Sequence, residues 1–173
     1  MDDVTRRSLL QGTGAAVAAA GFIQEAQART EPFGPTDPYD LIVRGGEVVG
    51  VQGTDAEKFS VTRAVTTGSW LGQPYQGQGI GKEMRAAILH LGFEGLGAEY
   101  AATSAFHDNL SSLGVTRALG YQPNGESIEI RREAADKQLH FLMTRAQWQE
   151  RRRDDITIEG LEPCLEMFGI APS

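Results

Sequence analysis

Short stretches in which apolar and polar residues alternate recur along the chain, and this period of two is typical of half-buried β-strands. The alternation is clearest at Leu139, Phe141 and Met143. We predict strands near residues 41–44, 47–53, 60–71, 99–106, 127–132 and 138–144. Residues 133–137 would join the last two strands as a hairpin loop.

A second pattern has the period of an amphipathic helix. Within residues 82–96, apolar side chains three or four positions apart form one stripe, which consists of Met84, Ala87, Ile88 and Leu91. Arg85 lies off this stripe. Two further helices are predicted at residues 110–119 and 146–153. Strands and helices together indicate an α+β fold with a mixed sheet and helices on its faces.

Composition limits the function more than it identifies it. The chain has 173 residues, of which 40% are hydrophobic, and this suits one globular domain of ordinary size. The net charge of −7 argues against a nucleic-acid partner. A single cysteine excludes an internal disulfide. Because the sequence has no run of eighteen apolar residues, we predict no membrane span.

The first 28 residues differ in character from the rest. Two adjacent arginines, Arg6 and Arg7, precede a small-residue apolar run at 12–23 and an Ala-Gln-Ala site at 26–28. This order resembles a twin-arginine export leader. The alternative is an N-terminal helix of the domain.

Residues 29–40 are rich in proline and glycine and are predicted to be a linker. A hairpin turning at Gly45-Gly46 would follow. Together with the leader, residues 1–49 resemble the start of an exported amidohydrolase. The metal chemistry of that class needs a His-x-His pair, but the histidines here, His90, His107 and His140, are scattered. We therefore expect no metal. A domain would occupy residues 41–153, with a C-terminal tail at 154–173 that either folds back or contacts a partner.

A glycine-rich segment connects the predicted strand ending near Trp70-Leu71 to the helix that starts near Lys82. Backbone N–H groups at a helix N-terminus have no partner in the helix, so such a turn is suited to a phosphate or pyrophosphate. Gly81-Lys82 is followed by Glu83, which breaks the P-loop pattern, and the third glycine of a dinucleotide fingerprint is missing. A plain glycine-rich turn remains the alternative.

Two signatures resemble the GNAT N-acetyltransferases over about residues 47–150. Gln76, Gly79 and Gly81 match the Gln/Arg-x-x-Gly-x-Gly/Ala loop that binds acyl-coenzyme A in that family, and about thirty residues later comes a match to its second signature. That second set consists of Asn109, Ser112, Gly120 and Tyr121. Residues 67–72 resemble the branch that includes ribosomal-protein N-terminal acetyltransferases.

The resemblance implies a GNAT-type mixed, mostly antiparallel sheet flanked by helices. The usual first strand and first two helices would be lacking, because the leader and linker occupy their place. It also implies acetyl-coenzyme A as cosubstrate, bound by a set of residues on the turn and the strand before it. These are Trp70, Leu71, Gln76, Gly77, Gln78, Gly79, Ile80, Gly81 and Lys82, joined by Asn109. The alternative is that Lys82 is simply an exposed lysine of the helix. For Asn109, the alternative role is that of an N-cap.

The implied catalytic groups are less complete. Many GNAT enzymes carry a tyrosine acid at the position of Thr116, so Ser112 is the candidate acid, with capping or packing as its alternative. The related branch often has a glutamate base at the position of Thr66. His107 beside Asp108 is a candidate base, and a plain loop histidine is the alternative.

The predicted function is transfer of acetyl from acetyl-coenzyme A to a primary amine on a peptide N-terminus or a small molecule. The alternatives are a coenzyme A-binding remnant and an interaction module without catalysis. An active enzyme would be cytoplasmic, where its donor is made, whereas the leader favours export by the twin-arginine route. A homodimer is a further hypothesis, because a partner could cover a sheet edge left open by the missing first strand.

Overall fold

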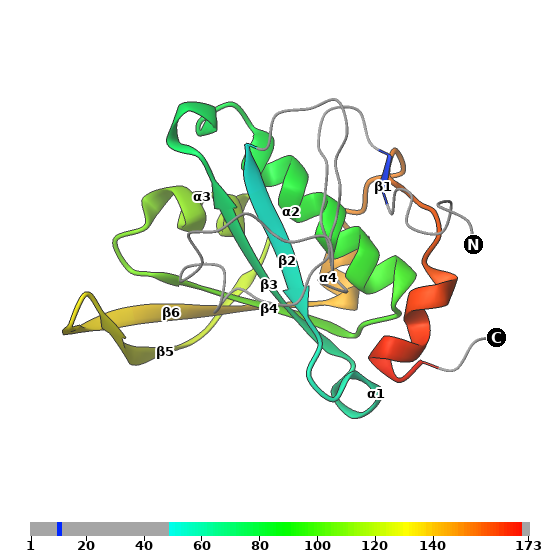
Figure 1. The fold of residues 1–173 in the computed structure, drawn as a ribbon. Coiled ribbons are helices and arrows are strands. Elements are labelled where there is room, and N and C mark those ends of the chain that lie inside the picture. Colours follow the sequence, from blue (N-terminus) through cyan, green and yellow to red (C-terminus); the bar gives the residue numbers. More distant parts are fainter. Residues whose placement is uncertain (1–9, 12–48, 171–173) are drawn as a thin grey trace, which may run out of the picture.

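The computed structural model describes residues 10–11 and 49–170, coloured by sequence in Figure 1. The predicted linker, the strand at 41–44, the turn at Gly45-Gly46 and almost all of the predicted leader lie outside the described residues. The elements are β1 (Leu10–Gln11), β2 (Gly50–Asp55), α1 (Phe59–Thr62), β3 (Ala64–Leu71), η1 (Gln73–Tyr75), α2 (Ile80–His90), η2 (Leu91–Gly95), β4 (Tyr100–Phe106), α3 (Leu110–Ala118), β5 (Gln122–Arg131), β6 (Ala134–Thr144), α4 (Arg145–Gln149), β7 (Thr157–Ile158) and η3 (Glu162–Phe168).

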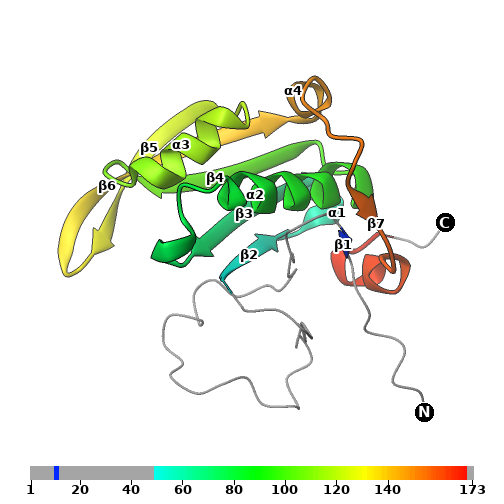
Figure 2. The same cartoon turned by 90° about the horizontal axis from the view of Figure 1, so that it is seen from above.

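Five strands form one open sheet in the order β2-β3-β4-β6-β5. Only the β3–β4 pair is parallel, and the other three pairings are antiparallel. Figure 2 shows α2 and α3 on one face of this sheet. Val65 of β3, Ala101 of β4 and Met143 of β6 point to that face and are buried. The predicted α+β class, with a mostly antiparallel sheet flanked by helices, is therefore confirmed.

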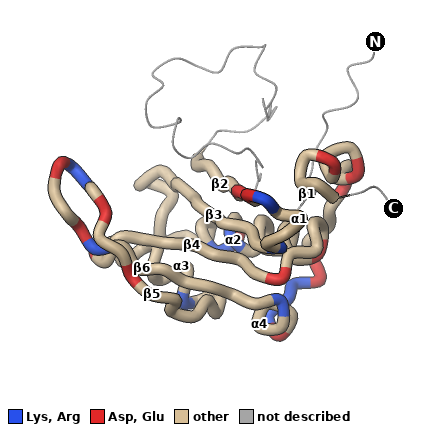
Figure 3. Tube along the Cα trace, turned by 90° about the horizontal axis from the view of Figure 1, so that it is seen from below, with Lys and Arg blue, Asp and Glu red and all other residues tan. Residues whose placement is uncertain are grey.

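The β5–β6 hairpin turns more tightly than predicted. Arg131 pairs with Ala134, so the turn is only Arg132-Glu133, and φ is positive at both, 50° and 66°. Two left-handed residues make the hairpin turn whose twist matches the strands. The predicted loop at 133–137 is therefore wrong, because β6 already begins at Ala134. Acidic and basic residues are interspersed along this hairpin (Figure 3).

The predicted strand at 60–71 begins later than expected. Residues Phe59–Thr62 form the short helix α1, bounded by Lys58 and Arg63 with φ of 50° and 49°. Phe59 is buried and meets Phe168 edge to face with ring centroids 6.4 Å apart. Burial of this aromatic side chain overrides the strand pattern of the local sequence.

Helix α2 and the predicted helix at 82–96 differ at both ends. The α-helix runs from Ile80 to His90 and continues as a π-helical turn, Leu91–Gly95. The predicted apolar stripe is buried. In the π-helical turn, a Cβ on Gly92 would lie 3.1 Å from Val65 Cγ2, so a glycine lets the helix lie close to β3.

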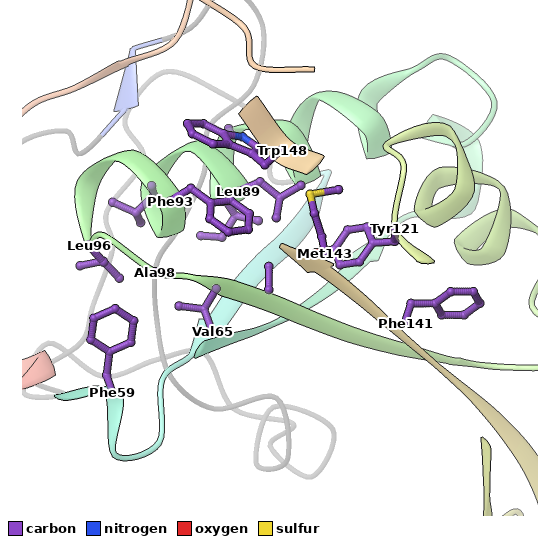
Figure 4. Close-up of a cluster of buried hydrophobic side chains, with 14 of the residues drawn as sticks. Phe59, Val65, Leu89, Phe93, Leu96, Ala98, Tyr121, Phe141, Met143 and Trp148 are labelled. Atoms are coloured by element: carbon purple, nitrogen blue, oxygen red, sulfur yellow. The ribbon is translucent and has the colours of Figure 1, made fainter. Parts of the chain in front are cut away.

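The core lies between α2 and the sheet (Figure 4). Phe93 stacks on Trp148 of α4 with ring centroids 5.1 Å apart, and His90 meets the same indole edge to face at 5.8 Å. Burial lowers the pKa of His90 below its ordinary value, so this ring is held neutral in the core. None of the described helices is long and apolar enough to cross a membrane.

The C-terminal segment folds back onto the domain. β7 pairs with β1, and η3 follows it. Leu161 is buried in the core cluster. Its side chain lies close to Gly95, because a Cβ added to Gly95 would be 2.8 Å from Leu161 Cδ2. This segment therefore completes the core at the end of α2.

Replacing Leu161 by alanine is expected to destabilise the protein by about 2–4 kcal/mol, because it leaves a cavity beside Gly95. Urea unfolding followed by circular dichroism measures the change. Met167→Ala is the matched control, since Met167 is 65% exposed on the same segment. Equal stability of the two variants would contradict a structural role for the segment.

Candidate functional site

The glycine-rich turn leaves a row of backbone donors open. Gly77 and Gly79 have φ of 74° and 87°, and a Cβ on either would meet nothing within 4 Å. These glycines are therefore needed for backbone conformation, not for space. Among the described residues, no acceptor takes the N–H groups of residues 77–81, while Gly79 O accepts from Lys82 N at 2.9 Å. The open donors end at the first turn of α2.

Side chains hold this turn in shape. The amide of Gln76 donates to Leu71 O at 2.9 Å, and the amide of Gln78 donates to Pro74 O at 2.9 Å. Ile80 and Gly81 are half-buried and begin α2, and Lys82 is exposed on its first turn. The structure thus brings all seven predicted turn residues together around the N-terminus of an eleven-residue helix, where the helix dipole favours an anion.

Strands β3 and β4 lie side by side only at their beginnings. Their parallel pairing covers Ala64–Thr66 with Tyr100–Ala102, and the later residues of the two strands are not paired with each other. Two threonines mark the point of divergence. Thr103 Oγ1 donates to Thr67 O at 2.9 Å, and Thr67 Oγ1 donates to Ala102 O at 3.4 Å. Beyond them, Trp70 and Leu71 at the end of β3 pair with β2 on one side and with no residue of β4 on the other.

Tyr121, the last residue of the second signature, joins this network. Its side chain is 3% exposed, and its hydroxyl lies 3.1 Å from Thr67 Oγ1. Because Thr67 donates to Ala102, Tyr121 is the donor in this pair. Burial raises the pKa of the Tyr121 phenol above its ordinary value, which keeps the donor proton in place.

Arg85 is the residue that the sequence pattern placed wrongly. It lies off the apolar stripe of α2, yet it is only 2% exposed. Its Nη1 donates to Thr103 Oγ1 at 3.1 Å and its Nη2 to Ser69 Oγ at 3.0 Å. Its partners belong to β3 and β4, so a helical periodicity could not reveal them. The sequence signal that position 85 faces inward is the pair of apolar residues three and four positions later, Ile88 and Leu89, which are both buried.

The first two residues of the second signature lie at the start of α3. Asn109 is the N-cap, and its Oδ1 accepts from Ser112 N at 3.1 Å. Ser112 is half-buried, and its hydroxyl has no hydrogen-bond partner in the described part of the chain. Thr116, where the resemblance expects a tyrosine, is fully buried with an unpartnered hydroxyl. Ser112 is therefore the more accessible of the two hydroxyls.

His107 lies just past the end of β4, with Nδ1 3.1 Å from Asp136 Oδ1. Arg131 Nη1 lies 2.7 Å from Asp108 Oδ1 and 3.0 Å from Asp136 Oδ2. The hydrogen bond from Arg131 lowers the pKa of the Asp136 carboxyl. His107, Asp108 and Asp136 have metal-ligand chemistry, but the guanidinium already supplies the positive charge there. These residues do not fit a metal ion.

Comparison with known proteins gives a consistent picture. A family model described as an acetyltransferase (GNAT) domain matches residues 6–122, more than half of the chain. Its start falls inside the segment that resembles an export leader.

Solved structures agree in fold. One described as a probable acetyltransferase has 19% identity and a TM-score of 0.56, covering 60% of this chain and 59% of that one. A GNAT-family acetyltransferase from Bacillus anthracis has 17% identity and a TM-score of 0.51, covering 57% and 59%. yncA from Salmonella typhimurium, solved with its cofactor acetyl-CoA, has 11% identity and a TM-score of 0.51, covering 56% and 57%. The chain thus spans less than two thirds of each of these structures.

Replacing Tyr121 by phenylalanine is expected to cost about 1–2 kcal/mol at neutral pH, because Thr67 loses a buried donor. The raised pKa of Tyr121 means that the folded protein keeps a proton that the unfolded chain releases above pH 10. The free energy of unfolding of the wild type therefore falls as the pH rises through that range. The phenylalanine variant lacks this loss, so the difference shrinks at alkaline pH.

Urea unfolding at pH 8 and pH 10.5 tests both statements. Tyr100→Phe is the control, because Tyr100 is 44% exposed and its loss of a hydroxyl should change little. A difference between Tyr121→Phe and wild type that stays constant between the two pH values would contradict the buried phenol.

Proposed function

Because the chain belongs to the family of GNAT acetyltransferase domains, we propose that it transfers an acetyl group from acetyl-coenzyme A to a primary amine. The observation that carries the proposal is the open row of N–H donors at residues 77–81, at the start of α2 and next to the divergence of β3 and β4. A phosphate-binding turn beside a gap between two strands suits a long donor with a pyrophosphate at one end.

Each predicted binding residue has a place in this proposal. The N–H groups of the turn would hold the pyrophosphate, with Lys82 adding positive charge. The backbone near Trp70-Leu71 would pair with the amides of the pantetheine arm like an added strand. Asn109 would contact that arm in addition to capping α3.

The reaction joins the amine nitrogen to the carbonyl carbon and breaks the carbon–sulfur bond. The amine must lose a proton, and the departing thiolate must gain one. Ser112 is the proposed acid for the thiolate, since its side chain is half-buried at the start of α3 and its hydroxyl has no hydrogen-bond partner among the described residues. Positioning of the two reactants supplies most of the acceleration.

A second candidate is a domain that binds coenzyme A without useful turnover. Thr116 favours it, because a fully buried threonine stands where many relatives carry a tyrosine acid. The identity of the acceptor, a peptide N-terminus or a small-molecule amine, does not decide between the two candidates.

We place the proposed reaction in the cytoplasm, where acetyl-coenzyme A is made. Two observations favour a domain that includes residues 10–11 over an export leader at this place. The family match begins at residue 6, and β1 at Leu10–Gln11 pairs with β7 at Thr157–Ile158.

Replacing Gly79 by glutamate is expected to abolish acetyl-coenzyme A binding, because bulk and negative charge then stand where the pyrophosphate binds. Isothermal titration of the full chain measures this. Gly125→Glu is a matched control: Gly125 also has positive φ, 101°, and open space around its Cβ, but it lies on the distant β5. Absence of binding by folded wild-type protein, or equal binding by Gly79→Glu, would remove the proposed donor site.

Replacing Ser112 by alanine is expected to lower kcat roughly 10²-fold while leaving acetyl-coenzyme A affinity unchanged, because general acid catalysis is worth about that much. Thiol release with a panel of primary amines measures kcat. Ser111→Ala is the control, since Ser111 is exposed on the neighbouring position of α3. If wild-type protein binds the donor but releases no thiol with any amine, the second candidate replaces the first.

A further inference from the structure

Within residues 49–170, one buried positive charge has no carboxylate partner. The four arginines at 131, 145, 152 and 153 each lie within 4 Å of an aspartate or glutamate oxygen at the surface. Arg85 is 2% exposed and donates to the hydroxyl groups of Thr103 and Ser69, and it also interacts with the hydroxyl of Tyr121. Within the described residues, it makes no ion pair with a carboxylate. Burying a charge without a counter-charge is costly.

The position of this charge is specific. Ser69 belongs to β3 and Thr103 to β4, and both follow the last residues at which these strands pair. The guanidinium therefore bridges the two strands where they separate. Its Nε is buried and has no partner in the described part of the chain. The site holds one unused N–H donor and an uncompensated charge at the opening between the strands.

A purely mechanical role does not account for the charge. The threonine pair already joins the strands at this point, through Thr103 Oγ1 to Thr67 O and Thr67 Oγ1 to Ala102 O. Thr103 can donate there and still accept from Arg85 Nη1. The two hydroxyl groups fix the direction of the guanidinium but do not neutralise it, which is the arrangement of a donor held ready for an anionic group.

We propose that Arg85 binds the carbonyl oxygen of the thioester and stabilises the negative charge that forms on it during acyl transfer. This inference rests on the proposed function. As the amine lone pair forms the C–N bond, the carbonyl π electrons move to the oxygen, and their return expels the thiolate. Arg85 faces that oxygen already oriented, so its attraction is stronger in the transition state than in the bound donor. Ser69 and Thr103 are positioning residues.

The test separates contact with the carbonyl from binding of the rest of the donor. Full-length wild type, Arg85→Met and Arg85→Lys are titrated with acetyl-coenzyme A and with S-ethyl-coenzyme A, a thioether of similar shape without a carbonyl. Arg85→Met is expected to weaken acetyl-coenzyme A about tenfold, the worth of a hydrogen bond to a charged group. It should leave S-ethyl-coenzyme A unchanged. Arg117→Met, an exposed arginine of α3, is the control and should change neither.

The carbonyl itself gives a second readout. With [1-13C]acetyl-coenzyme A bound, the carbonyl stretching frequency should be lower in wild type than in Arg85→Met, because the guanidinium polarises the bond. With an active amine, kcat should fall about 10²-fold in Arg85→Met while the KM of the amine changes little. If Arg85→Met does not fold, Ser69→Ala tests the same contact with a smaller effect in the same direction.

The outcomes are distinguishable. If wild type binds neither ligand, the proposed function fails and this inference with it. If wild type binds both, and Arg85→Met weakens both equally or neither, only the role of Arg85 is overturned and the donor site stands. Selective loss for the carbonyl-containing ligand, with a shifted stretching frequency, supports the inference.

Discussion

The structure depends on a single local event, the separation of two parallel strands that begin side by side. At Thr66 and Ala102 the backbones of β3 and β4 still pair, and one residue later side-chain hydroxyl groups replace them. This exchange satisfies buried carbonyl groups that a diverging pair would otherwise leave without donors. The opening is thus stabilised by specific hydrogen bonds of the sheet. Helices α2 and α3 lie next to it on one face of the sheet.

The polar groups at this opening form one connected system instead of separate contacts. Tyr121 reaches Thr67 from the end of α3, and Arg85 reaches Thr103 from α2. Two segments that lie far apart in sequence are therefore tied to the same pair of threonines. Such networks fix a unique arrangement when every member is satisfied. Here one member, Arg85 Nε, is not, and that exception lies at the opening of the proposed site.

The sequence predicted the parts that short-range patterns control. Glycines at 77 and 79, the N-cap at Asn109 and the alternation of β6 are local features, and all appear in the structure where the pattern indicated. The polar network was not predictable in the same way. Thr67 and Thr103 look like ordinary strand residues, and their hydrogen bonds to the opposite strand span 35 and 36 positions. Likewise, α1 forms because Phe59 packs on Phe168, a residue more than a hundred positions later.

The contact between Phe59 and Phe168 also has a consequence for how the protein is made. Ribosomes release the chain from its N-terminal end, so β3, β4 and α2 leave the exit tunnel well before Leu161 and Phe168 do. The core cluster includes these late residues, and β1 at Leu10–Gln11 pairs with β7 near the other end of the chain. The core is therefore complete only after these late residues have left the exit tunnel, and contacts of such long range make folding slow. A nascent chain that stalls before residue 157 would expose apolar surface at the end of α2, where quality-control factors could recognise it.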